Sequence, residues 1–274
     1  MAAKEYLITI LLFSIMISTT LSEFNPRHVE DTNIENEISI TIEGTNLQIL
    51  YKFFKENPSQ VFINGHEATI QNYVIQNPNN LQTNNDVIIK WNREIYNCSY
   101  MFYDLANIIS VNLTNFKLSN IINTEKMFCN CQKLKTIIFS HGMTKVENMK
   151  YMFYNCNKLQ SLDLSSFNTA KVNNMDDIFT GCNELKSLDI SNFNLNGLTN
   201  SKTLTFLKSL NNLNKLEDLK ARNLIISHIT DISNIFKNNK NLISIDLSSL
   251  DASSATTMAQ IFYNCSNLLS LNLQ

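Results

Sequence analysis

The sequence contains few of the residues that most often interrupt regular structure. It has 5 Gly and 3 Pro in 274 residues, which excludes collagen-like and Pro/Gly-rich low-complexity structure. It also lacks an excess of charge of one sign, because the formal net charge is −2, whereas nucleic-acid-binding proteins usually carry a basic excess. The hydrophobic share of 44% argues against disorder over most of the chain. We therefore expect a folded protein without a nucleic-acid partner.

Long apolar runs are also absent, with one exception at the N-terminus. Residues 6–17 are mostly apolar, follow a lysine and precede small residues that are typical of a cleavage site before Glu23. Residues 1–22 are therefore interpreted as a secretory signal peptide. The alternative, a transmembrane helix, would need about 20 apolar residues. We expect an extracellular or cell-surface protein, attached to a membrane only through the signal peptide or an anchor that this chain does not contain.

A repeat dominates the rest of the chain. Residues 151–165 recur in altered form from Met101 onward, and position 0 of each repeat is defined here as the first residue of the Met-Phe pair or its equivalent. Position 0 is occupied in turn by Met101, Met127, Met152, Ile178, Ser209, Ile235 and Ile261. Position +1 is Phe in six of these seven repeats, and position +7 is Leu or Ile in all of them. Residues 98–274 are thus predicted to form a solenoid of about seven repeats, with the last one incomplete.

Two periodicities alternate within each repeat. Apolar residues at positions −3, 0, +1 and +4 follow the spacing of a helix that buries one face. Positions +7, +10 and +12 then form Leu-x-x-Leu-x-Leu, whose last pair alternates as a strand does. The predicted fold class is therefore α/β: a leucine-rich-repeat solenoid with one helix and one strand per 26-residue repeat. Its strands should form one parallel sheet, because a single repeat cannot bury both of its apolar faces.

The repeat resembles that of a known family. The run Met-Phe-Tyr-Asn-Cys-Asn-Lys-Leu-Gln-Ser-Leu-Asp-Leu-Ser-Ser-Phe-Asn-Thr-Ala-Lys-Val-Asn-Asn-Met, residues 152–175, is similar to the 26-residue leucine-rich repeat of BspA-like surface proteins. The resemblance covers residues 98–274 and is weakest between 195 and 225. It implies a secreted or surface-anchored solenoid used in adhesion or recognition, but it implies no particular ligand or binding residue.

The segment before the repeats, residues 23–97, is predicted to be a small β-rich cap, loose at its start. Short strands are expected at residues 38–43, 48–54, 61–64 and 69–76. Asn64–Gly65 predicts a hairpin. Residues 86–91 lie about one repeat length before the first repeat strand, so we expect them to be the strand that caps the solenoid sheet.

No pattern for catalysis is visible. The four histidines fall in different segments, and neither of the two within the repeats lies beside a recurring carboxylate or thiol. The sequence has no P-loop, no Gly-rich dinucleotide turn and no Gly-x-Ser-x-Gly. We therefore expect no enzymatic activity, no cofactor and no metal.

The cysteines fall into two groups. Those at position +4 and the one at position −3 are expected to be buried; they are Cys131, Cys156, Cys182, Cys265 and Cys98. They are interpreted as stacked small hydrophobic residues. Disulfides between adjacent coils stay open as an alternative, because the strand spacing lies within the range that a disulfide needs. Cys129 occupies position +2, which is otherwise Tyr or polar, and is predicted to be the most exposed thiol.

The outward side of the predicted strands is the candidate binding surface. It combines hydroxyls, carboxylates and two basic residues at positions +9, +11 and +13. The candidates are Ser161, Asp163, Ser165, Ser187, Asp189, Ser191, Asp218, Lys220, Arg222 and Asp246. Lys220 would offset the repulsion of roughly 1 kcal/mol between stacked carboxylates. This face is poor in aromatic residues, which favours a protein over a sugar ligand, while ordinary solubilising composition and a cation site are the alternatives.

Three Asn-x-Ser/Thr sequons begin at Asn97, Asn112 and Asn264. In a eukaryotic host we expect glycan at Asn97 or Asn112. We expect little at Asn264, because it belongs to a column of asparagines predicted to bond backbone between coils.

The last repeat stops after its strand. Phe262, Leu268 and Leu271 are therefore expected to be partly uncovered, unless more chain or a second copy covers them.

The function predicted from these features is a non-catalytic leucine-rich-repeat protein that mediates adhesion or recognition through a protein or cell-surface ligand. The alternative is a structural extracellular spacer or matrix component without a specific ligand.

Overall fold

The structure, a computed structural model, describes residues 36–76, 78, 81–139 and 141–274. The predicted signal peptide and the first residues of the predicted cap lie outside the described residues. The strands are β1 (Asn36–Glu43), β2 (Gln60–Ile63), β3 (His66–Glu67), β4 (Ile70–Gln71), β5 (Val74–Ile75), β6 (Asn84–Trp91), β7 (Ile108–Leu113), β8 (Thr136–Phe139), β9 (Ser161–Asp163), β10 (Ser187–Asp189), β11 (Asp218–Lys220), β12 (Ser244–Asp246) and β13 (Ser270–Asn272). The helical elements are η1 (Leu118–Asn120), α2 (Asn200–Ser209) and η2 (Leu210–Asn212).

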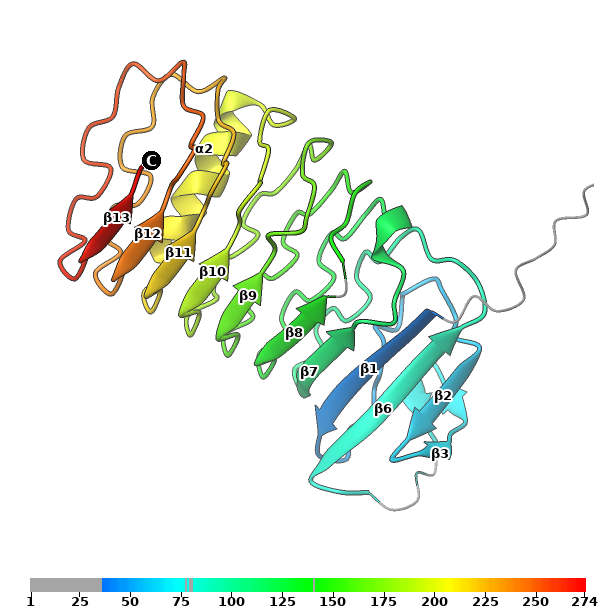
Figure 1. Cartoon of the computed structure of the whole chain (residues 1–274). Coiled ribbons are helices and arrows are strands. Elements are labelled where there is room, and N and C mark those ends of the chain that lie inside the picture. Colours follow the sequence, from blue (N-terminus) through cyan, green and yellow to red (C-terminus); the bar gives the residue numbers. More distant parts are fainter. Residues whose placement is uncertain (1–35, 77, 79–80, 140) are drawn as a thin grey trace, which may run out of the picture. The chain divides into compact units, whose positions relative to one another are not determined.

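Two long antiparallel strands, β1 and β6, organise the part of the chain before the repeats. Burial alternates along both of them, because successive side chains of a strand point to opposite faces of the sheet. The predicted hairpin is confirmed: Asn64 and Gly65 have φ of 48° and 83°, and β2 pairs with β3 across them. The sheet runs in the order β3-β2-β6-β1-β7-β8, so it continues into the first two repeat strands (Figure 1).

The strand beside the solenoid is β1, so the prediction that residues 86–91 cap the solenoid sheet is wrong. β1 pairs antiparallel with β7, where Ile40 lies opposite Val111. β6 pairs with the other side of β1, where Val87 lies opposite Ile40. Both strands are rich in β-branched residues and alternate in burial, so their local sequences suit either place. Which of the two strands lies beside β7 is therefore decided by pairing between distant segments.

Two further strand predictions need correction. In residues 48–54 only an isolated bridge from Gln48 forms, and no strand. Residues 69–76 split into the hairpin of β4 and β5, because Asn72 and Tyr73 between them have φ of 51° and 61° and reverse the chain.

The repeats form the predicted parallel-sheet solenoid, with one strand per coil (Figure 1). Neighbouring strands pair in parallel from β7 to β8 and from β9 to β13, and equivalent repeat positions lie opposite one another, as Leu162 and Leu188 do. Among the described residues β8 and β9 are not paired, so the prediction that all repeat strands form one parallel sheet is wrong at this point. The predicted buried row of Leu134, Leu159 and Leu185 is confirmed, since each is 0% exposed. Each coil thus covers the apolar row of the one before it.

The predicted helix of each repeat is wrong for all coils but the fifth, because two consecutive turns take its place. In the third coil, Tyr151 and Asn155 at positions −1 and +3 have φ of 56° and 57°, and the same positions have positive φ in the other turn-forming coils. Residues in the left-handed region cannot continue a right-handed helix. Backbone N–H groups therefore bond to the next coil: the N–H of Phe128 donates to the carbonyl of Met152 at 2.9 Å.

The apolar positions that suggested a helix are nevertheless buried. Positions −3, 0, +1 and +4 of the third coil, Met149, Met152, Phe153 and Cys156, are all 0% exposed. The Phe rings at position +1 of coils one to four stack with centroid separations of 5.5, 5.8 and 6.1 Å. The two turns bring positions three and four apart to one side, as a helix does. The periodicity therefore predicted the buried residues correctly, but it predicted the wrong backbone conformation.

The fifth coil, which is the longest, contains the helix α2. Thr199 caps it, and its hydroxyl accepts a hydrogen bond from the N–H of Lys202 at 3.4 Å. Phe206 and Leu207 are 0% exposed and supply the apolar contacts that the turns supply elsewhere.

The last coil leaves its outer side partly uncovered, as predicted. Leu271 is 42% exposed, while Phe262 and Leu268 are half-buried.

Among the described residues, no helix has both the length and the apolar character needed to cross a membrane.

Candidate functional site

The predicted polar residues gather on the sheet formed by β9 to β12. Asp189 lies between Asp163 on one neighbouring strand and Lys220 on the other, and Lys220 in turn lies opposite Asp246. Of the ten candidates, Ser161, Asp163 and Arg222 are exposed, Ser165, Ser187, Asp189, Asp218, Lys220 and Asp246 are half-buried, and Ser191 is buried. The register therefore places the predicted residues next to one another.

The carboxylates at position +11 serve the backbone of their own coil. An oxygen of Asp163 accepts hydrogen bonds from the N–H of Ser165 at 2.9 Å and from its hydroxyl at 2.6 Å. Asp189 and Asp246 accept the N–H two residues further on in the same way, at 2.9 and 3.0 Å. Such bonds close the turn after each strand. The carboxylates thus have a structural role whether or not a ligand binds.

Arg222, rather than Lys220, forms the ion pair on this face. Its Nε donates to Asp246 at 2.6 Å. Desolvation opposes ionisation of Asp246, but the hydrogen bonds from Ser248 and the Arg222 guanidinium outweigh it and lower the pKa of this carboxyl. The Arg222 side chain is 55% exposed, so solvent screens the pair, and it stabilises the fold by no more than about 1 kcal/mol.

A second surface, the tyrosine face, lies over the turns of coils one to three. We define it as Tyr51, Tyr100, Tyr103, Lys126, Cys129, Tyr151 and Tyr154. Apart from Tyr51, these residues occupy positions −1 and +2, which flank the buried positions 0 and +1. All five tyrosines are half-buried. The tyrosines at position +2 were recognisable in the sequence as pointing away from the apolar stripe, but no periodicity places Tyr51, which belongs to the cap.

The rings of the tyrosine face pack against one another. Tyr51 contacts Tyr103 edge-to-face, with centroids 4.8 Å apart, and stacks on Tyr100 at 6.1 Å. Tyr100 and Tyr103 are 5.4 Å apart, as are Tyr151 and Tyr154 two coils further along. These contacts form two aromatic ridges, one in the first coil and one in the third.

Lys126 bridges the two ridges. Its ammonium lies 4.9 Å from the ring centroid of Tyr100 and 5.7 Å from that of Tyr151. It also donates a hydrogen bond to the Tyr100 hydroxyl at 3.0 Å, and this bond, opposed by desolvation, raises the pKa of Lys126. The ammonium is therefore charged and held in place between the rings.

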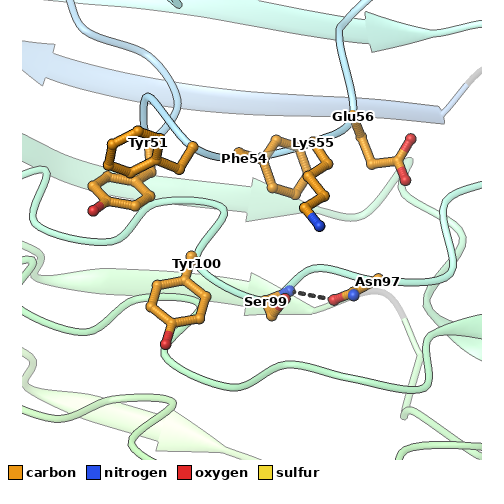
Figure 2. Close-up of a pocket in the computed structure, with 8 residues that line it drawn as sticks. Tyr51, Phe54, Lys55, Glu56, Asn97, Ser99 and Tyr100 are labelled. Atoms are coloured by element: carbon orange, nitrogen blue, oxygen red, sulfur yellow. Dashed lines mark hydrogen bonds between the residues drawn. The ribbon is translucent and has the colours of Figure 1, made fainter.

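The first pocket of this face lies between residues 51–56 and the first coil. It has a volume of about 450 Å³. Figure 2 shows Lys55 and Glu56 on one side and Asn97, Ser99 and Tyr100 on the other. The Asn97 side chain accepts the N–H of Ser99 at 2.8 Å, which shapes the coil wall of the pocket.

The second pocket lies between the two ridges and has a volume of about 320 Å³. It is lined by Tyr103, Lys126, Cys129, Asn130, Tyr151, Tyr154, Asp177 and Thr180. Cys129 stands where the first and third coils have Tyr103 and Tyr154, so its small side chain leaves the space between these rings open. Asp177 accepts the hydroxyl of Thr180 at 3.0 Å at the fourth-coil end.

The prediction that Cys129 is the most exposed thiol is wrong. Cys129 is 4% exposed, whereas Cys265 is half-buried. Position +2 does face outward, but the larger side chains around Cys129 extend beyond it and leave it recessed at the base of the second pocket. Burial raises the pKa of Cys129 to about 11, despite the opposing effect of Lys126.

The other cysteines pack in the interior, and all six are free. Those at position +4 place their sulfur 3.1 to 3.2 Å from a carbonyl of the preceding coil, as Cys156 does with Phe128. Cys98 and three of the four at position +4 are buried as predicted, while Cys265 is only half-buried. Burial raises the pKa of Cys182 to about 12, so this thiol is protonated at neutral pH.

Within the described residues, no three His, Cys, Asp or Glu side chains lie close enough together to hold a metal ion. His228 is bonded to Thr203 at 3.0 Å and to Asn196 at 2.9 Å, which gives it a structural role.

The sequons differ in their surroundings. Asn97 is exposed and Asn112 is half-buried on the strand face. Asn264 is exposed, and its amide donates to the Asn238 side chain at 3.1 Å rather than to backbone as predicted. The expected glycan distribution stays a prediction.

Comparison with known proteins finds one family whose model matches most of the solenoid. The model of one family, described as "Mycoplasma protein of unknown function, DUF285", matches residues 96–219 and 205–273. No curated protein matches the chain.

Proposed function

The chain belongs to the DUF285 family, and we propose that it is a secreted or cell-surface recognition module, related to the BspA-like leucine-rich-repeat proteins, that mediates adhesion or protein binding without catalysis. The resemblance of its repeat to the BspA-like repeat supports the cellular setting. The solenoid supports the binding role, because stacked coils present an extended surface whose outward positions can vary without loss of the core.

The tyrosine face is the observation on which the proposal rests. The turns themselves do not require tyrosine, since the fourth coil forms the same turns with Asp177 and Thr180 at positions −1 and +2. Half-buried tyrosines offer a large, rigid contact area with a polar end, and they are enriched where proteins bind one another. Phe53, 68% exposed, extends this area beside Tyr51 at a centroid distance of 5.5 Å.

The strand face is the second candidate surface. Its serines and carboxylates extend over four paired strands. Because Asp163 and Asp189 already accept backbone N–H groups, we place this face behind the tyrosine face as the binding surface.

Binding of the labelled full chain to cultured animal cells and to bacterial cells tests the proposal. We expect Tyr103→Ala with Tyr154→Ala to weaken saturable binding at least about tenfold, as loss of buried aromatic contacts does at interfaces. Asp163→Asn with Asp189→Asn is the matched control on the strand face and should bind as the unchanged chain does.

Each other outcome has a definite meaning. Loss of binding in the Asp variants alone would move the site to the strand face. Absence of saturable binding to either cell type, together with self-association in sedimentation experiments, would favour the structural spacer and contradict the proposal.

A further inference from the structure

We propose that the second pocket, between the ridges Tyr103 and Tyr154, binds an extended proline-rich peptide in the polyproline II conformation. This inference rests on the proposed function and names its ligand class. It depends on the spacing of the ridges, the depth of the position between them, the free hydroxyls around it and the charge at its end.

The spacing of the ridges corresponds to one turn of a polyproline II helix. The two ridges lie two coils apart, which is roughly 10 Å at the separation of hydrogen-bonded strands. Lys126 contacts both Tyr100 and Tyr151, so the ridges can be no farther apart than the sum of those two distances. A polyproline II helix repeats every three residues, or about 9 Å. Residues i and i+3 of such a ligand would therefore meet the two ridges equivalently.

Cys129 makes room for one residue between the ridges. At position −1 the corresponding space between Tyr100 and Tyr151 is filled by Lys126. At position +2 the side chain of Cys129 is short, so it forms the floor of the 320 Å³ pocket between the rings. A proline ring is compact, apolar and already ordered, so it can pack there at a small cost in conformational entropy.

The hydroxyls around this pocket can bond the ligand backbone. Within the described part of the chain, the hydroxyls of Tyr103, Tyr151 and Tyr154 have no hydrogen-bond partner, in contrast to that of Tyr100, which accepts from Lys126. A polyproline II segment has no internal hydrogen bonds, so its carbonyls are free to accept from such donors.

The carboxylate of Asp177 sets the direction in which the peptide would lie across the ridges. Asp177 lines the fourth-coil end of the pocket, and in the described residues no Lys, Arg or His forms an ion pair with it. Lys126, which lies between the ridges, already donates a hydrogen bond to the Tyr100 hydroxyl. A basic residue of the ligand would therefore lie beside Asp177, and the proline-rich part would cross the ridges.

Calorimetric titration of the full chain with a synthetic peptide tests the inference. The probe has about ten residues, roughly three turns of polyproline II, with arginine at one end and Pro-Pro-x repeats after it. The control peptide has the same length and charge, with each Pro replaced by Ala. We expect saturable binding of the first peptide and at least about tenfold weaker binding of the second.

Variants locate the binding. Tyr154→Ala should weaken it at least about tenfold, while Tyr263→Ala, at the same repeat position in the seventh coil, should leave it unchanged. Cys129→Tyr restores the tyrosine of the neighbouring coils and should abolish binding by filling the pocket. Asp177→Asn should weaken only arginine-bearing peptides. Thermal unfolding shows whether each variant folds. If Cys129→Tyr does not fold, the binding of Tyr154→Ala alone tests the inference.

Three results would overturn the inference: equal binding of both peptides, normal binding by Cys129→Tyr, or absence of peptide binding. Binding of a neutral oligosaccharide that becomes tighter in Cys129→Tyr would assign the ridges to sugar stacking. If cells still bind through Tyr103 and Tyr154 while no proline-rich peptide does, the proposed function stands and the ligand class is wrong.

Discussion

Asn155 distinguishes the observed pair of turns from the helix that the periodicity predicted. Its φ is 57°, and its amide donates to the side-chain oxygen of Asn130 in the preceding coil at 3.1 Å. We compare Asn155→Gly with Asn155→Ala. Both variants lose this hydrogen bond, which contributes about 0.5–1.5 kcal/mol to the free energy of unfolding. They differ in the free-energy cost of holding residue 155 at a positive φ.

Alanine in the left-handed region costs about 1–2 kcal/mol, whereas glycine adopts it freely. Glycine loses roughly 0.4–1 kcal/mol of this advantage because the unfolded chain is more flexible. We therefore expect Asn155→Gly to be more stable than Asn155→Ala, by about 1 kcal/mol. In a helix the order would be reversed, with alanine more stable by about 1 kcal/mol.

Urea unfolding measures this difference through the shift of the midpoint, provided that the slope with urea concentration is the same for both variants. Asn183, exposed in the fourth coil and without positive φ, supplies the control pair. There Ala should be at least as stable as Gly. If Asn155→Ala proved more stable than Asn155→Gly, the assignment of two turns to this segment would be refuted.

Three other changes test the packing of the coils. Leu159→Ala removes a side chain that is 0% exposed and should lower the free energy of unfolding by about 2–5 kcal/mol; a loss below about 1 kcal/mol in urea unfolding would contradict the buried row. A thiol reagent added to the folded chain should modify Cys265 first and Cys129 later, because Cys265 is the less buried and the pKa of Cys129 is raised to about 11; mass mapping that finds Cys129 modified first would contradict this order. Gly142→Ala would place a Cβ against the backbone carbonyl of Ser166, so the backbone would have to move. We expect the free energy of unfolding to fall by about 3 kcal/mol or more. An unchanged thermal midpoint would refute the close approach of Gly142 to the Ser166 backbone.

The candidate site was only partly visible in the sequence. The repeat positions alone place Asp163, Asp189 and Lys220 in one row, and the strand register agrees. The tyrosines at position +2 were also identifiable as outward-facing. The contact of Tyr51 with Tyr103 was not, because it joins the cap to the first coil across a separation in sequence that no period relates.

The sequence by itself determined the repeat, the parallel stacking and the buried columns. Each coil contacts only its neighbours, so a residue type that recurs at one position must occupy the same environment every time. Asn64–Gly65 determined its hairpin for a local reason, since both residues tolerate positive φ.

Only the tertiary structure decided where the backbone hydrogen bonds go. An apolar stripe at positions −3, 0, +1 and +4 suits a helix that bonds within itself and a pair of turns that bonds to the next coil. Asn and Gly at position +3 favour the turns, but Tyr151 at position −1 carries no such preference. The same holds for β1 and β6, whose alternation is alike. Each choice depended on which distant segment offered free N–H and carbonyl groups at the right distance, and single-residue preferences do not contain that information.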